Sequence, residues 1–185
     1  MPEHPSAIVI LAEDQEHQNL VWHYLKNCMA YKKRMPWCVR KVALPGSQGC
    51  GSQYVREQFP KQVAACRERY LKPLLIVITD ADNLSVVARE KELHEELKKK
   101  NHTAVSVEEP IVILVPKWQV ETWIKCLAGQ TVLESDKNSD RPAVTTPDIV
   151  NASQTLHEWA RPHAQVGHTC VNSLNAALPR WLRIG

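Results

Sequence analysis

The 185-residue sequence predicts an α/β fold in which helices flank a mostly parallel sheet. Short, continuous runs of β-branched residues alternate with longer segments of helical periodicity over the first 128 residues. Such uninterrupted apolar runs are typical of strands that a parallel sheet buries on both faces. The composition, with 44% hydrophobic and 23% charged residues, excludes disordered, collagen-like and coiled-coil proteins.

Four apolar runs are the expected strands. The runs at 7–12, 74–78 and 111–115 are continuous and rich in β-branched residues, so we expect them inside the sheet. The run at 37–44 includes an Arg-Lys pair, and charged side chains within a strand favour an edge or half-exposed position.

Helical patterns fill the intervals between these strands. Apolar residues recur at helical spacing over 15–29, 52–70 and 85–100, and again in a segment that begins near Lys117. Pro60 lies inside the second segment, where we expect a kink or a restart of the helix.

The character of the chain changes after residue 128. We expect residues 1–128 to form the α/β domain and residues 129–185 to form a loop and a helical extension that packs on it. Residues 130–150 show no period and are rich in turn formers, which predicts a long loop. The two short amphipathic helices expected beyond it carry Leu156 and Trp159, and Val171, Leu174, Leu178 and Trp181.

Polar residues follow three of the predicted strands. Open parallel sheets bind ligands outside the carboxyl ends of their strands, so these residues are the first candidates for a site. The first strand is followed by Glu13 and Asp14, the third by Asp80 and Asp82, and the fourth by Lys117 and, one turn into the helix, Glu121.

The spacing of Asp80 and Asp82 favours a metal site. If the strand runs through residue 82, both side chains point the same way, because side-chain direction alternates along a strand. Two such carboxylates can share a Mg²⁺ ion, and Glu13 from the neighbouring strand end can supply a third. The cysteines and histidines show no zinc-site spacing, and we assign no chemistry to any of the eight histidines.

A glycine-rich segment follows the second predicted strand and precedes a helix. Gly46, Gly49 and Gly51 permit tight turns, and backbone N–H groups at the helix start near Ser52 can hold a phosphate. Arg56, one turn into the helix, supports this phosphate-binding prediction. The glycine spacing matches neither a P-loop nor a dinucleotide fingerprint, and a plain strand–helix loop remains an equal alternative.

Three segments together resemble the TOPRIM family, the catalytic module of topoisomerases, primases and overcoming-lysogenization-defect nucleases. Ile8-Val-Ile-Leu-Ala-Glu13 is similar to its first acidic motif, and Ile76-Val-Ile-Thr-Asp-Ala-Asp82 to its Asp-X-Asp motif. The segment from Ile113 to Trp123 resembles a strand and Glu-X-Trp helix of small bacterial TOPRIM-like proteins, some of them linked to phage defence. The resemblance implies a Rossmann-like, TOPRIM-type sheet.

The resemblance also implies roles for the residues at the strand ends. Glu13 would assist proton transfer or share a metal, while Asp80 and Asp82 would bind Mg²⁺ or Mn²⁺. Glu121 would support a second metal, and Lys117 would steady a phosphate. The expected function is a Mg-dependent nuclease or other phosphodiester-processing enzyme of a bacterial defence system that acts on nucleic acid, with an ATPase subunit as a potential partner.

Other functions remain open at this point. One is a non-catalytic TOPRIM-like subunit that binds nucleic acid or a partner protein. A receiver-like signalling domain would use the acidic pair Glu13-Asp14 together with Asp80 and Lys117. A sugar-nucleotide transferase would use the segment 79–83 to bind its metal. No signal peptide and no apolar run of membrane-spanning length is visible, so we expect a cytoplasmic protein without a membrane partner.

Overall fold

The computed structural model describes residues 7–46, 51–134 and 143–185. The elements in chain order are β1 (Ile8–Ala12), α1 (Gln15–Asn27), α2 (Met29–Lys32), β2 (Val39–Lys41), α3 (Gly51–Arg67), β3 (Leu74–Ile78), α4 (Val86–Lys99), β4 (Ile111–Leu114), α5 (Val120–Leu127), α6 (Thr146–Trp159) and α7 (Asn172–Ile184). Four strands form one sheet in the order β2-β1-β3-β4, and every neighbouring pair is parallel. The predicted α/β fold is confirmed.

The sheet is buried at its centre and more open at the β2 edge. In the registers of β1 with its two neighbours, Ile10 pairs with Lys41 on one side and with Ile76 on the other. Every residue of β1 and β3 is buried, whereas β2 is short and half-exposed. The Arg-Lys pair therefore indicated the edge strand correctly.

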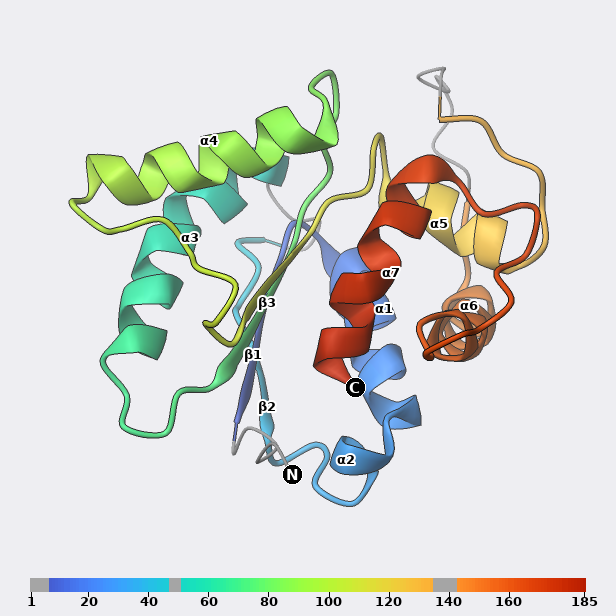
Figure 1. Ribbon diagram of the computed structural model, residues 1–185, viewed down its shortest axis with the longest axis horizontal. Helices are drawn as coiled ribbons and strands as arrows, with labels where there is room; N and C mark the ends of the chain where they lie inside the picture. Colours follow the sequence, from blue (N-terminus) through green and yellow to red (C-terminus); the bar gives the residue numbers. More distant parts are fainter. Residues whose placement is uncertain (1–6, 47–50, 135–142) are drawn as a thin grey trace.

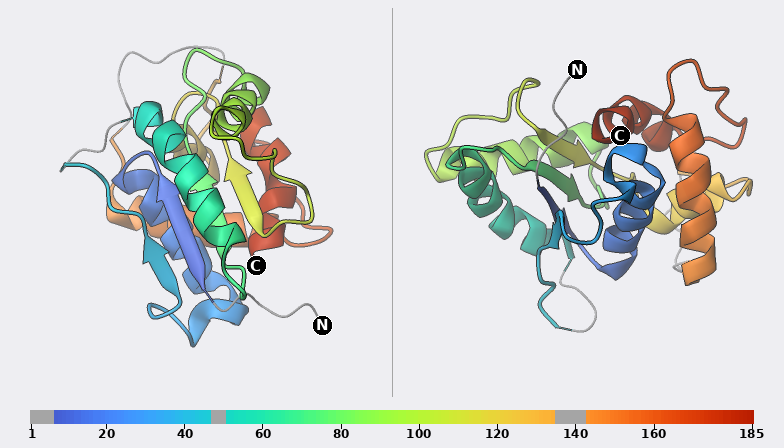
Figure 2. Two further views of the ribbon diagram at one scale, coloured as in Figure 1. Left: turned by 90° about the vertical axis from the view of Figure 1, so that its left-hand side faces the viewer. Right: turned by 90° about the horizontal axis from the view of Figure 1, so that it is seen from below.

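Two layers of helices cover the sheet. α3 and α4 lie on one face, and the remaining helices lie on the other (Figure 1), a division that two further views show equally (Figure 2). Alternate residues of β1 face the two layers, with Ile8 and Ile10 in one core and Val9 and Leu11 in the other. Both faces are apolar because both are covered.

The boundaries of three helices differ from the sequence prediction. α3 continues as one helix through Pro60, and α5 begins at Val120, so Lys117 precedes the helix. α6 begins inside the predicted loop, because Thr145 and Asp148 form a capping box with Pro147 in its first turn.

The two C-terminal helices share a core with the α/β part of the chain. α6 packs against α1 and α5, and α7 packs against β4. Two tyrosines, one in α1 and one in α2, donate hydrogen bonds to α7. Tyr24 donates to the carbonyl of Trp181 and Tyr31 to that of Ile184, both at 2.8 Å. None of the helices in the described parts of the chain is both long and apolar enough for a membrane crossing.

Candidate functional site

The carboxyl ends of β1 and β3 bring Glu13 and Asp80 together. Their exposed fractions are only 9% and 5%. The Oε2 atom of Glu13 accepts hydrogen bonds from the Thr79 hydroxyl at 2.8 Å and from the Asp80 amide at 2.9 Å. Glu13 therefore holds the first residues of the loop that leaves β3.

The first turn of α1 places an imidazole between two carboxylates. Asp14 is the N-cap of α1 and accepts from the backbone amide of His17 at 3.1 Å. The fully buried His17 ring lies with Nδ1 2.6 Å from Asp14 Oδ1 and Nε2 2.9 Å from Asp80 Oδ1. Asp14, His17 and Asp80 thus form a continuous chain of polar contacts between the loops that follow β1 and β3.

Burial and charge shift the pKa values of Glu13, His17 and Asp80, which we call the acidic cluster. Burial alone would lower the pKa of His17, but the charge of Asp80 and hydrogen bonds to Asp14 and Asp80 raise it well above its usual value. Burial, and then the charge of Asp80, raise the pKa of Glu13. Burial also raises the pKa of Asp80, against the opposing charge of His17. The shift of the His17 pKa favours the protonated form of its ring.

The same residues have the geometry of a metal site. Glu13, His17 and Asp80 each offer one ligand atom, and these atoms lie within 4.8 Å of one another. The carboxylate oxygens of Glu13 and Asp80 suit Mg²⁺ or Mn²⁺. Because Nδ1 and Nε2 of His17 lie against the carboxylates of Asp14 and Asp80, the ring orients Asp80 in the arrangement seen here.

Glu121 lies close to this cluster, as the position of the fourth strand predicted. It is in the first turn of α5 and is 2% exposed. Its charge contributes to raising the pKa of Asp80, so the two carboxylates interact electrostatically. The ends of three strands therefore contribute acidic side chains to one region.

Asp82 does not extend this cluster in the way predicted. The expectation of a strand through residue 82 is wrong, because β3 ends at Ile78 and Asp82 has a left-handed φ of 53°. Its side chain is 49% exposed and its Oδ2 atom accepts from Arg89 at 3.1 Å. Asp80 thus contacts α1, while Asp82 contacts α4 in the opposite helical layer.

Lys117 fastens the loop between β3 and α4. Its Nζ atom donates to the carbonyls of Asp82 at 3.2 Å and Leu84 at 2.7 Å, and lies 4.0 Å from the centre of the Trp118 ring. The structure assigns this lysine a structural contact that the sequence did not indicate. Its contact with a phosphate remains a prediction.

The start of α3 lies against the acidic cluster. A Cβ atom at Gly51, whose φ is +69°, would lie 3.8 Å from Glu13 Oε1, and Ser52 donates to Asp82 Oδ2 at 3.4 Å. Of the other predicted phosphate-binding residues, Gly46 has a φ of 79°, Gly49 lies outside the described residues, and Arg56 contacts Glu92 at 3.5 Å. Phosphate binding there remains a prediction.

His17 is the site residue that sequence reasoning missed. The signal that could have found it is the spacing Asp14-X-X-His17 directly after a buried strand, which puts an N-cap carboxylate and an imidazole on the same helical turn. The second contact of the ring, with Asp80, joins residues 63 positions apart and has no local signature.

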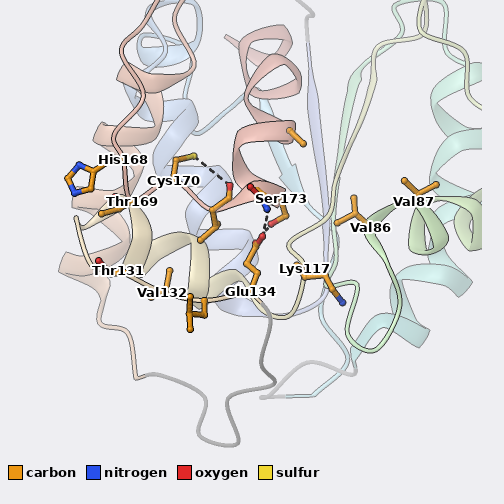
Figure 3. A pocket seen from close by; sticks show the side chains of 14 residues that line it. Val86, Val87, Lys117, Thr131, Val132, Glu134, His168, Thr169, Cys170 and Ser173 are labelled. Carbon is orange, nitrogen blue, oxygen red and sulfur yellow. Dashed lines mark hydrogen bonds between the residues drawn. The ribbon is translucent and has the colours of Figure 1, made fainter.

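A separate pocket of about 830 Å³ lies between the start of α4, the 131–134 segment and the start of α7 (Figure 3). Lys117 lines it, whereas Glu13, His17 and Asp80 do not. Glu134 accepts hydrogen bonds from the amide of Ser173 at 3.0 Å and from its hydroxyl. The pocket is therefore a neighbour of the acidic cluster and not part of it.

Comparison of the chain with protein-family models, curated proteins and solved structures found no match. The TOPRIM resemblance of the three short segments remains a prediction.

Proposed function

We propose that the protein is a divalent-metal-dependent phosphodiester hydrolase that acts on nucleic acid. The observation that supports this proposal best is the group of ligand atoms from Glu13, His17 and Asp80, all within 4.8 Å of one another. They lie where β1 and β3 end side by side, and open parallel sheets bind their ligands outside these strand ends.

The donor atoms fit a hard cation. Glu13 and Asp80 would hold Mg²⁺ or Mn²⁺ through carboxylate oxygens, and Glu121 would add a further negative charge. A bound ion would neutralise charge on the phosphate and make an attached water more acidic. The burial of all three carboxylates, at 9% exposure or less, strengthens their attraction for such an ion.

The residues of the chain have distinct roles in this proposal. Asp14 orients His17 through Nδ1, and His17 orients Asp80 through Nε2, so the carboxylate keeps one direction. Thr79 and the Asp80 amide hold one oxygen of Glu13.

The first test is cleavage of plasmid DNA, single-stranded DNA and RNA with Mg²⁺ or Mn²⁺, and again with EDTA. We expect cleavage only with metal, and a loss of at least about 100-fold in kcat for Asp80→Asn, which keeps the size of the side chain. Glu68→Gln, on an exposed residue at the end of α3, is the matched control and should cleave as the wild type does. Full activity in folded Asp80→Asn, or cleavage in EDTA, would contradict the proposal.

A non-catalytic subunit is the second candidate. The contacts of both His17 nitrogens favour it, because an imidazolium can balance buried carboxylates without any metal. In that case the protein would bind nucleic acid or a partner. Titration with Mn²⁺ would then give the same result for the wild type and for Asp80→Asn, with no heat of binding that depends on Asp80. A titration calorimetry experiment on both proteins distinguishes the two candidates.

The remaining elements of the proposal concern the biological setting. We infer a component of a bacterial defence system, with an ATPase subunit as partner, from the TOPRIM resemblance alone, and the cytoplasmic location stays the prediction made from the sequence. Co-purification of the tagged full chain from its native host tests the partner, and recovery of the chain alone would contradict that part.

A further inference from the structure

Two lysines lie over one tryptophan of α1, the helix that begins at the acidic cluster. The Nζ atoms of Lys26 and Lys41 lie 5.7 Å and 4.8 Å from the centre of the Trp22 ring. His23 is the next residue along α1, and burial together with the two lysines lowers its pKa, which favours the neutral ring. We call these four residues the Trp22 patch.

The patch extends from the acidic cluster along α1. Gln18 donates to the carbonyl of Val42 at 2.8 Å, which joins α1 to the residue after β2. Trp22 and Lys26 follow Gln18 at steps of four on the same face of the helix. A helix rise of about 12 Å separates Asp14 from Trp22, so one extended ligand can reach both.

The charges of the patch are not balanced within the described part of the chain. Burial and the two lysines lower the pKa of His23, and burial and Lys26 lower the pKa of Lys41. No described acidic residue forms an ion pair with either lysine, in contrast to Arg67, which pairs with Glu109 at 2.7 Å. Cationic groups gathered without a carboxylate are complementary to an anion such as a phosphate.

We propose that the Trp22 patch binds a single-stranded segment of the nucleic acid, with Lys26 and Lys41 on phosphates and a base stacked on Trp22. The ring faces both ammonium groups, and phosphates are stronger partners for these groups than an indole face. When the lysines turn to phosphates, the ring becomes available to an unpaired base. This inference names the substrate class of the proposed function and rests on it.

Two features favour a single strand over a duplex. Bases of a duplex are already stacked on one another, so Trp22 could add nothing to duplex binding beyond the two lysines. The carboxylates at the strand ends are 9% exposed or less, so a scissile phosphate has to approach them on a narrow, flexible chain.

The test is fluorescence anisotropy with a labelled oligothymidylate and a labelled duplex of equal length, in EDTA so that nothing is cleaved. We expect Lys26→Ala/Lys41→Ala to weaken single-strand binding at least about 10-fold and to reduce the slope of log K against log salt by about 1.4. Trp22→Leu should weaken single-strand binding and leave duplex binding unchanged. Lys98→Ala/Lys100→Ala, on exposed lysines at the end of α4, removes the same charge elsewhere and should bind as the wild type does.

Three outcomes would overturn the inference. They are wild-type binding by folded Lys26→Ala/Lys41→Ala, an equal loss in Lys98→Ala/Lys100→Ala, and tighter binding of the duplex than of the single strand. Thermal melting of each variant confirms that it is folded. Because binding is measured without metal, its loss is distinguishable from a failure of the proposed hydrolysis, which the Asp80→Asn cleavage assay reports.

Discussion

At the scale of single residues, the acidic cluster retains protons more strongly than the unfolded chain does. The pKa values of Glu13, His17 and Asp80 are all raised in the folded protein. Stability that depends on such groups is fully present below their unfolded pKa values and is lost as the pH rises through the folded ones. The cluster therefore stabilises the fold least at alkaline pH, where its carboxylates repel one another.

This shift predicts how stability depends on pH and metal. As the pH rises above 6.5, the ordinary pKa of histidine, urea unfolding should show the wild type losing stability relative to Asp80→Asn. Mn²⁺ should raise the melting temperature more at the alkaline end, because the ion then no longer competes with protons. An equal effect of Mn²⁺ on Asp80→Asn, or no effect on either protein, would indicate that the cluster does not bind the ion.

The two aspartates of the Asp-X-Asp motif should differ in their effects on activity. Asp80 is buried against His17, whereas Asp82 is half-exposed and contacts Arg89. We expect Asp82→Asn to retain a substantial part of the cleavage activity that Asp80→Asn loses. Side-by-side measurement of kcat for both variants tests this, and an equal loss would show that Asp82 reaches the site when substrate is bound.

At the scale of elements, the loop between β3 and α4 is held by residues from both of its neighbours. Arg89 in α4 is 4% exposed and donates to the carbonyls of Asp80 at 2.9 Å and Ala81 at 3.3 Å. Lys117 holds the same loop from the end of β4. The position of Asp80 therefore depends on α4 as well as on its own strand.

Removing the Arg89 guanidinium should loosen this loop. Arg89→Leu leaves the carbonyl of Asp80 without the Arg89 donor and the carboxylates of Asp82 and Glu92 without their guanidinium partner, at a cost of about 2–4 kcal/mol in unfolding free energy. Arg69→Leu, on an exposed arginine, should change it by no more than about 0.5 kcal/mol. Urea denaturation of both variants measures the difference, and similar values would contradict the role of Arg89.

At the scale of the whole molecule, the C-terminal helices complete the larger core. Trp181 of α7 is fully buried, with its ring 4.7 Å from Tyr24 of α1 and 6.5 Å from Trp123 of α5. Figure 1 shows α7 beside α1 on the face of the sheet opposite α3 and α4. The helices α6 and α7 therefore cover apolar surface that the α/β part of the chain would otherwise leave open.

Truncating this tryptophan should be costly. Trp181→Ala should lower the unfolding free energy by about 3–5 kcal/mol, because it removes a large, closely packed side chain. Trp37→Ala is the matched control, because Trp37 is 92% exposed and its loss should cost no more than about 0.5 kcal/mol. Equal midpoints of thermal or urea unfolding for the two variants would show that α7 adds little to the core.

The sequence by itself determined the strands and the strand-end acids of this protein. β-Branched runs specify the buried strands β1, β3 and β4 through local chain preference and burial, and parallel strands expose their carboxyl ends at one edge. Glu13 and Asp80 could therefore be predicted as neighbours, because each directly follows a strand.

Only the tertiary structure decided which side chains complete the site. His17 gains its role from Asp80, 63 positions along the chain, and Asp82 is turned away by a left-handed backbone and by Arg89. Such contacts depend on the packing of α1 and α4 against opposite faces of the sheet, which no local pattern encodes. Periodicity predicts what a segment buries, whereas the partner of a buried polar group is set by the three-dimensional arrangement.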